Sequence, residues 1–322
     1  MKPVQISVVI PLFNKEKHIL ATLESVTSQH YPVSEIIVID DGSTDCSADV
    51  VASSNINNLR LVRQNNQGVS AARNTGIKAA RFPYVAFLDG DDQWLPFFTE
   101  EMAHLIQRYP DASAYTSRYQ CVESGNKFVD PKIYLNDVDP YGMIMHNYFE
   151  LASKGDLPFM MSSTLVKKDI FERIDGFPVG EKMGEDQDVF ARIALHGYIA
   201  YCPNINLLYH RDTDNRACDN NVPYEECGFS KRLHEIVNCS TFDEKLRQDI
   251  IRYTAAHLCH LAKQNIRNQN PAVALKLLRD KRCFTKPKHL IALSLWASFQ
   301  QVYLALIALL SGQKPKSNTQ AI

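Results

Sequence analysis

The first half of the chain alternates short β-branched runs with helix-like stretches, and this alternation limits the fold more than any other feature of the sequence. The predicted strands are 7–10, 35–39, 59–63 and 84–88, and the predicted helices between them are 17–29, 47–53 and 70–81. Strands that alternate with helices form βαβ crossovers, which build a mostly parallel sheet with helices on both faces. We therefore predict an α/β, Rossmann-like fold.

Polar residues follow three of the predicted strands at the point where each strand ends. The strand ends run into Pro11-Leu12-Phe13-Asn14, Asp40-Asp41-Gly42 and Asp89-Gly90-Asp91-Asp92. In open α/β sheets, ligands bind beyond the carboxyl ends of the strands. The sequence therefore predicts a ligand site at this edge of the sheet.

The acidic run at 89–92 is the strongest chemical signal in the chain. Three carboxylates within four residues repel one another unless a cation lies between them. The Asp-Gly-Asp alternation can point two carboxylates at one ion, and Gly90 lets a ligand approach the backbone. Oxygen ligands of this kind suit Mg²⁺ or Mn²⁺. Aspartates are also common in turns and helix caps, so the run alone leaves both interpretations open.

A wider pattern consists of five blocks that follow one another along the chain. The blocks are SVVIPLFN (7–14), EIIVIDDGSTD (35–45), NNQGVSAARNTGI (65–77), VAFLDGDD (85–92) and GEDQDVFARIALHG (184–197). Over roughly residues 5–212 the chain resembles the family 2 glycosyltransferases. The resemblance implies the GT-A fold and an inverting transfer of a sugar from a nucleotide diphosphate to a hydroxyl group. The Gln-x-x-Arg-Trp signature of processive synthases is absent from the sequence, which favours a single addition.

The resemblance implies donor-binding roles at the first two strand ends. Phe13 corresponds to an aromatic residue that stacks on the base, Pro11 offers its backbone alongside, and Asp41 corresponds to the carboxylate that binds the uracil edge. A UDP-sugar donor is therefore expected, with another nucleotide-sugar as the alternative. Phe13 could instead pack in the core, and Asp40, also a candidate donor contact, could together with Asp41 merely form an Asx-type turn with Gly42.

The resemblance also implies a metal-assisted donor site. Arg73, on the predicted helix 70–81, could face the base, the diphosphate or the acidic run, or it could be an ordinary surface arginine. Asp91 corresponds to the direct metal ligand, and Asp89, with Gly90 beside it, lies near the donor ribose or the metal. His210 could reach the metal or the diphosphate, although the family's Arg-x-His element is missing and a His there is as often packed or solvated. The expected cofactor, Mn²⁺ or Mg²⁺, stabilises negative charge on the leaving diphosphate.

A second acidic group, Glu185, Asp186 and Asp188, precedes the helix-like stretch 189–195. By the resemblance, Asp186 is the catalytic base, which takes the proton of the acceptor hydroxyl in a single displacement with inversion. Glu185 would orient the acceptor or support Asp186, and Asp188 is expected to face solvent. The alternative is a simple preference for acidic residues in the first turn of a helix.

Two other classes of function fit parts of the pattern. A catalytically idle module would keep the fold in order to bind a nucleotide or glycan, but it would need no base on the acceptor side. A sugar nucleotidyltransferase shares the sheet architecture, but such enzymes normally open with a Gly-rich phosphate loop, which residues 11–17 do not resemble. Residues 115–165 are expected to recognise the acceptor, and no motif names it.

Residues 223–322 are predicted to form a basic helical extension that follows a catalytic domain of residues 1–222. Residues 231–289 carry 13 Lys+Arg and 5 Asp+Glu, whereas residues 1–230 carry 20 and 31. The predicted helices are 227–238, 242–268, 271–280 and 287–311. Ser294, Ser298 and Gln301 form a polar stripe on the last of them, which follows the basic residues Lys281, Arg282, Lys286 and Lys288. This pattern favours a helix in an anionic membrane interface, with a buried helix, a homodimer contact or a bilayer span as alternatives.

The N-terminal residues and the cysteine spacing indicate the cellular compartment. Met1-Lys2-Pro3 runs directly into the first predicted strand, unlike a signal peptide, and none of the eight Cys forms a Cys-x-x-Cys pair. We expect a cytoplasmic protein, peripheral on the cytoplasmic face of the membrane. The expected acceptor is a glycan or lipid-linked glycan of cell-envelope polysaccharide or lipopolysaccharide synthesis, and no nucleic-acid partner is expected.

Overall fold

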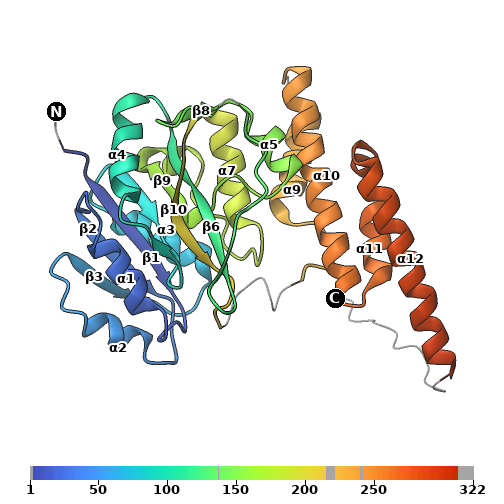
Figure 1. The fold of residues 1–322 in the computed structure, drawn as a ribbon, viewed down its shortest axis with the longest axis horizontal. Helices are drawn as coiled ribbons and strands as arrows, with labels where there is room; N and C mark the ends of the chain where they lie inside the picture. Colours follow the sequence, from blue (N-terminus) through green and yellow to red (C-terminus); the bar gives the residue numbers. More distant parts are fainter. Residues whose placement is uncertain (1–2, 137, 215–221, 240–241, 311–322) are drawn as a thin grey trace. The chain divides into compact units, whose positions relative to one another are not determined.

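The computed structural model describes residues 3–136, 138–214, 222–239 and 242–310 of the chain. The chain divides into two compact units, Met1–Asn220 and Asn221–Ile322. The first unit is a sheet with helices on both of its faces, and the described part of the second unit is helical (Figure 1).

The helices and strands lie close to their predicted positions. In the first unit they are β1 (Ile6–Leu12), α1 (Ile19–Thr27), β2 (Glu35–Asp40), α2 (Ser47–Ala52), β3 (Leu59–Arg63), α3 (Val69–Ala79), β4 (Tyr84–Phe87), β5 (Gln93–Trp94), α4 (Phe98–Arg108), β6 (Ala114–Glu123), β7 (Lys127–Val129), β8 (Met143–Met145), α5 (Tyr148–Lys154), the 3₁₀ turn η1 (Met161–Ser163), β9 (Thr164–Lys167), α6 (Lys168–Arg173), α7 (Glu185–His196) and β10 (Ile199–His210). In the second unit they are α9 (Gly228–Cys239), α10 (Glu244–Arg267), α11 (Pro271–Leu278), the 3₁₀ turn η2 (Lys281–Thr285) and α12 (Pro287–Leu310). Residue 311, the predicted end of the last helix, lies outside the described residues.

The described strands form one sheet in the order β3-β2-β1-β4-β9-β6-β10-β5, with β7 paired to β6 and β8 paired to β10. Strands β3, β2, β1 and β4 are parallel to one another. Beyond β4 the sheet is mixed, because β9 runs antiparallel to both β4 and β6. The predicted α/β fold is confirmed, and the carboxyl ends of β1, β2 and β4 meet at one edge of the sheet.

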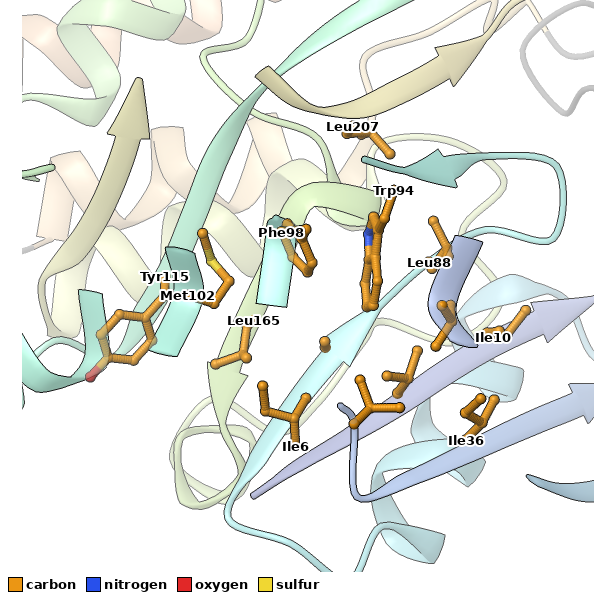
Figure 2. Close-up of a cluster of buried hydrophobic side chains, with 14 of the residues drawn as sticks. Ile6, Ile10, Ile36, Leu88, Trp94, Phe98, Met102, Tyr115, Leu165 and Leu207 are labelled. Atoms are coloured by element: carbon orange, nitrogen blue, oxygen red, sulfur yellow. The ribbon is translucent and has the colours of Figure 1, made fainter. Parts of the chain in front are cut away.

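The alternation of side chains along β1 builds the core on one face. Ile6, Val8 and Ile10 join a buried cluster with residues of α1 and α4. Figure 2 shows this cluster, which extends from the β1 isoleucines to Phe98 of α4 and Leu207 of β10. Burial of each such side chain stabilises the fold by about 1.5–3 kcal/mol.

Helix α3 packs against β1 and β2 at a distance that only glycine permits. A Cβ atom on Gly76 would lie 2.2 Å from Cγ1 of Val9, which points away from the cluster of Ile6, Val8 and Ile10. A side chain at position 76 would push α3 away from the sheet. The close approach of α3 brings Arg73, one turn earlier on the same helix, against the end of the sheet.

Helix α10 is the centre of the second unit, and α9, α11 and α12 all pack against it. Arg282 is buried and forms two parallel hydrogen bonds with Glu226, at 2.7 and 2.8 Å, as well as bonds to Asp280. Arg282 is therefore part of the structure of this unit and does not belong to an exposed basic surface. Lys281 and Lys288, from the same predicted basic group, are exposed.

Helix α12 has an exposed surface that is largely apolar. Leu293 and Ala297 are buried, whereas Ser298 and Gln301 lie exposed among large apolar side chains. The exposed apolar residues are Ile291, Leu295, Trp296, Phe299, Val302, Tyr303, Leu306, Ile307, Leu309 and Leu310. The segment Pro287–Ile307 is 21 residues long, has a mean hydropathy of 1.6 and is 11% buried, so its length and composition suffice for a bilayer span.

Candidate active site

Elements from distant parts of the first unit meet at the carboxyl edge of the sheet. The loop after β2 contacts the start of α3 through Asp41, whose carboxylate accepts a hydrogen bond from the Gly68 amide at 2.8 Å. Helix α3 in turn contacts the loop after β4 and the start of α7 through Arg73. The residues predicted at strand ends and at 185–186 are therefore brought together.

Arg73 is the centre of this arrangement. Its side chain is 2% exposed, and its guanidinium lies 2.8 Å from Asp89 Oδ1 and 2.5 Å from Asp186 Oδ1. Glu185 Oε1 lies 3.6 Å from the same Nη1 atom that contacts Asp186. One buried cation therefore joins a carboxylate that follows β4 to two carboxylates at the N-terminus of α7. The alternative of an ordinary surface arginine is wrong.

The charges of this cluster do not balance, because three carboxylates surround one guanidinium. Burial disfavours the charged form of Arg73, but the attraction of Asp186, Asp89 and Glu185 outweighs it and raises the pKa of Arg73. Burial raises the pKa of Asp186 to about 8, against the opposing effect of Arg73. Burial likewise raises the pKa of Glu185. A raised pKa near neutrality is typical of a carboxylate that moves protons.

The segment around Phe177, which no sequence motif marked, packs against the Arg73 guanidinium. The guanidinium carbon lies 5.2 Å from the ring centroid of Phe177, a cation–π contact. The Asn74 side chain forms two 2.8 Å hydrogen bonds with the backbone of Phe177. It donates to the Phe177 carbonyl and accepts from the Phe177 amide. Arg192 donates to the Gly176 carbonyl at 2.7 Å. The turn-forming pair Asp175-Gly176 is the signal that could have marked this segment.

The start of α7 corrects one prediction. Glu185 and Asp186 occupy the first turn of α7, and their side chains are 16% and 27% exposed. Asp188 was expected to face solvent, but it is buried and forms an ion pair with Arg192, one turn further along α7. Because Arg192 also holds the Gly176 carbonyl, Asp188 supports the Phe177 segment.

The aspartates at the end of β2 bind the protein itself. Asp41 is buried, and its carboxylate accepts hydrogen bonds from the Gln64 side chain and from the amides of Gln67 and Gly68, at 2.7, 3.0 and 2.8 Å. It therefore holds the loop that leads into α3. The Asp40 carboxylate accepts from the Ser43 amide at 3.0 Å, three residues further along the chain, so it too holds the loop after β2.

The end of β1 carries an exposed aromatic ring. Phe13 is 42% exposed, so the alternative that it packs in the core is wrong. Pro11 is paired within the sheet, opposite Ile39 of β2. A Cβ atom on Gly90 would lie 3.3 Å from the Pro11 carbonyl oxygen, so glycine at this position lets the acidic run pack closely against β1.

Asp91 lies apart from the Arg73 cluster and has its own partners. Its Oδ2 atom is 2.6 Å from Lys15 Nζ and accepts a hydrogen bond from Thr213 Oγ1 at 2.7 Å. Asp92 is buried and accepts from Ser162 Oγ at 2.6 Å and from the His210 amide at 3.0 Å. Ser162 also accepts from the Asp89 amide, so it fixes the acidic run on both sides. The sequence analysis missed Lys15, Ser162 and Thr213.

The described residues fit a divalent cation that is shared with a ligand. No group of three or more His, Cys, Asp and Glu side chains in the described part of the chain forms a complete cation site. The Nε2 atom of His210 is buried and has no hydrogen-bond partner among the described residues. The printed distances leave Asp91 with two partners, Lys15 and Thr213, both at its Oδ2 atom. Mg²⁺ and Mn²⁺ commonly take only one or two protein ligands and complete their shell with phosphate oxygens and water.

Comparison with known proteins identifies the family to which this fold and acidic site belong. The model for "Glycosyl transferase family 2" matches residues 7–174. The chain belongs to this family. The match includes Asp41, Arg73 and the acidic run at 89–92, whereas Glu185 and Asp186 lie beyond it.

Curated relatives share part of the chain. Glycosyltransferase GlyA of Streptococcus pneumoniae is 31% identical over 188 residues, which cover 56% of this chain and 27% of GlyA. The Escherichia coli protein WfaP, named as a UDP-Glc:alpha-D-GlcNAc-diphosphoundecaprenol beta-1,3-glucosyltransferase, is 33% identical over 115 residues, 35% of this chain and 46% of WfaP. The chain thus spans less than half the length of either relative.

Solved structures share the fold over almost the whole chain. S. aureus TarS 1–349 in complex with UDP-GlcNAc superposes with a TM-score of 0.68 at 19% identity, covering 97% of this chain and 93% of that chain. The same TarS fragment in complex with UDP gives a TM-score of 0.63 at 17% identity. At these identities the likeness establishes the fold.

Replacement of Arg73 should destabilise the protein strongly. Arg73→Met leaves three carboxylates near one another without a counter-ion, and we expect a loss of about 3–5 kcal/mol in the free energy of unfolding at pH 8. The loss should shrink towards pH 5, because the raised pKa values of Glu185 and Asp186 let these two carboxylates take up protons as the pH falls. Urea unfolding at both pH values measures it.

The matched control for this prediction is Arg63→Met. Arg63 is 60% exposed and lies 3.9 Å from Asp40 and 3.6 Å from Asp49, so its loss should cost less than about 1 kcal/mol. Equal unfolding midpoints for the two variants at pH 8 would contradict a structural role for the Arg73 cluster.

Proposed function

We propose that the chain transfers a single sugar, with inversion, from a UDP-sugar to a hydroxyl group of a glycan or lipid-linked glycan in cell-envelope polysaccharide synthesis. The observation that carries this proposal is the contact of Arg73 with both Asp89 and Asp186. Through it, a carboxylate of the acidic run that follows β4 is joined to a carboxylate with a raised pKa. A binding module without activity has no need for the second of these.

Support for a UDP-sugar comes from the end of β1, where the exposed ring of Phe13 is free to stack on a base. The Asp41 carboxylate is engaged by the protein, so its proposed part at the donor is to hold the loop that leads into α3. The TarS fragment was solved in complex with UDP-GlcNAc and with UDP, and the name of WfaP includes a UDP-glucose donor and a diphosphoundecaprenol acceptor. These complexes and this name support the same classes of donor and acceptor for this chain.

Asp91 and His210 are the residues that would hold Mn²⁺ or Mg²⁺, because Asp91 offers a carboxylate in the acidic run and His210 Nε2 has no partner among the described residues. The cation supplies stabilisation of negative charge on the departing diphosphate. Asp92 and Ser162 keep the acidic run in its conformation.

Asp186 is the proposed base. Its carboxylate accepts the proton of the acceptor hydroxyl while the hydroxyl oxygen attacks the anomeric carbon of the sugar. The bond from that carbon to the diphosphate oxygen breaks, and UDP leaves with the bonding electrons. Arg73 orients Asp186 through the 2.5 Å contact, and Glu185 lies against the same guanidinium atom. One displacement of this kind inverts the configuration of the sugar carbon.

Binding of UDP tests the donor. Isothermal calorimetry of the full chain should detect UDP binding that requires Mn²⁺, and Asp91→Ala should remove the metal dependence because it deletes the proposed ligand. The affinity for UDP should exceed that for GDP and ADP by at least about tenfold, since a base-specific hydrogen bond contributes about 1–2 kcal/mol. Equal affinities for the three nucleotides would overturn the choice of UDP.

Asp186→Asn tests the base. The variant should lose about 10²–10⁴-fold in kcat, because the amide cannot accept the hydroxyl proton. UDP affinity should remain close to that of the wild type. The kcat/KM of the wild type should rise with pH up to about 8 and level off above it, because Asp186 must be ionised to act.

Asp169→Asn is the control for this experiment, since Asp169 is 56% exposed on α6 and forms a surface ion pair with Arg173. Its turnover should match that of the wild type. Normal turnover in Asp186→Asn would remove Asp186 as the base.

We also propose that α12 attaches the chain to the cytoplasmic face of an anionic membrane. The helix presents exposed apolar side chains to the membrane surface. Two exposed lysines support the same location: Lys281 precedes the helix and Lys288 lies in its first turn.

Leu295→Asn with Phe299→Asn should abolish flotation with phosphatidylglycerol vesicles, because both side chains are more than half exposed. Phe128→Asn with Tyr141→Asn, which changes two exposed rings of the first unit, is the control. Vesicle-independent dimers that dissociate in the α12 variant would support the dimer contact instead.

A further inference from the structure

Lys15 has no role in the proposed function, yet its side chain contacts Asp91, the predicted metal ligand. Lys15, in the loop between β1 and α1, places its ammonium 2.6 Å from Asp91 Oδ2 and donates to the Asp214 carbonyl at 2.7 Å. The side chains of Lys15 and Asp91 are only 12% and 15% exposed. Such a buried charge pair is fixed in geometry and differs from a surface salt bridge.

The backbone of Lys15 is anchored independently of its side chain. Its amide donates to Ser47 Oγ at 2.7 Å, and its carbonyl accepts from the amides of His18 and Ile19 at the start of α1. Lys17, two residues later, makes a contrasting contact: it pairs with the Asp214 carboxylate at 2.7 Å, and both side chains are more than 60% exposed. Of these two lysines, Lys15 alone reaches the acidic run.

We propose that Lys15 is a further donor-binding residue, whose ammonium holds Asp91 while the donor is absent and binds the donor diphosphate when a divalent cation takes Asp91. This proposal rests on the proposed function, because it concerns the same donor. It adds a residue that the family resemblance did not supply and a competition between two cations for one carboxylate.

The competition follows from charge. A divalent cation that approaches Asp91 meets the positive charge of Lys15 next to the oxygen it must bind, so Lys15 weakens cation binding in the absence of donor. Two oxygens that share one Mg²⁺ lie about 3 Å apart, because each is about 2.1 Å from the ion. A phosphate oxygen that shares an ion with Asp91 is therefore a neighbour of the ammonium, which then gains a charged partner to replace Asp91.

Binding measurements on the full chain test both halves of the proposal. Electron paramagnetic resonance measures Mn²⁺ binding without nucleotide, and calorimetry measures UDP and uridine binding at saturating Mn²⁺. Lys15→Met should bind Mn²⁺ alone about tenfold more tightly and UDP about tenfold more weakly, since it loses the competing charge and the diphosphate contact. Uridine affinity should not change, because uridine has no phosphate. Lys15→Gln should behave in the same way and supplies the same measurements if Lys15→Met does not fold.

Lys17→Met is the matched control, because it removes a lysine from the same loop without touching Asp91. It should retain wild-type affinities for Mn²⁺ and UDP. If both Lys15 variants bind either Mn²⁺ alone or UDP as the wild type does, the proposal is overturned. If the folded wild type binds Mn²⁺ but not UDP, the proposed donor fails, and the metal titration still decides whether Lys15 competes at Asp91.

Discussion

The buried guanidinium of Arg73 is the interaction on which the arrangement of this site depends. It holds three carboxylates from two separate parts of the chain, and loss of the cation would set those carboxylates against one another. Other contacts serve to keep Arg73 in place: Asp41 fixes the start of its helix, and Phe177 lies under its charge. The remaining excess of negative charge favours cations and proton uptake at this edge of the sheet.

Much of the fold follows from local sequence patterns. The strands and helices of the first half are short, regular and separated by clear turn residues, so every predicted element there is present within two residues of its predicted ends. The order of the strands beyond β4 does not follow from periodicity, because β9 enters the sheet between β4 and β6 from a distant part of the chain. Local patterns carry no information about such a pairing.

The candidate site, like the fold, could be predicted from the sequence only in part. The strand pattern predicted Asp89 at the sheet edge, and the family resemblance added Arg73, Glu185 and Asp186; Arg73 does join Asp89 with Glu185 and Asp186. The supporting contacts were missed because they connect residues far apart in sequence: Ser162 reaches Asp89 across 73 positions, and Asn74 reaches Phe177 across 103. The burial of Asp188 was missed for a related reason, since its partner Arg192 is drawn inward by the Gly176 carbonyl.

The missing side chain of Gly76 has a consequence for the chemistry as well as for packing. Gly76 lets α3 lie against Val9, and Arg73 is carried by the same helix, so the depth of the guanidinium relative to the strand ends is set by the absence of one methyl group. A helix displaced by a fraction of an ångström would move Arg73 and both carboxylates of α7 together, since they are joined. Alignment of the two halves of the site is thus a property of the helix–sheet spacing, and a side chain at position 76 would shift the site from a position outside it.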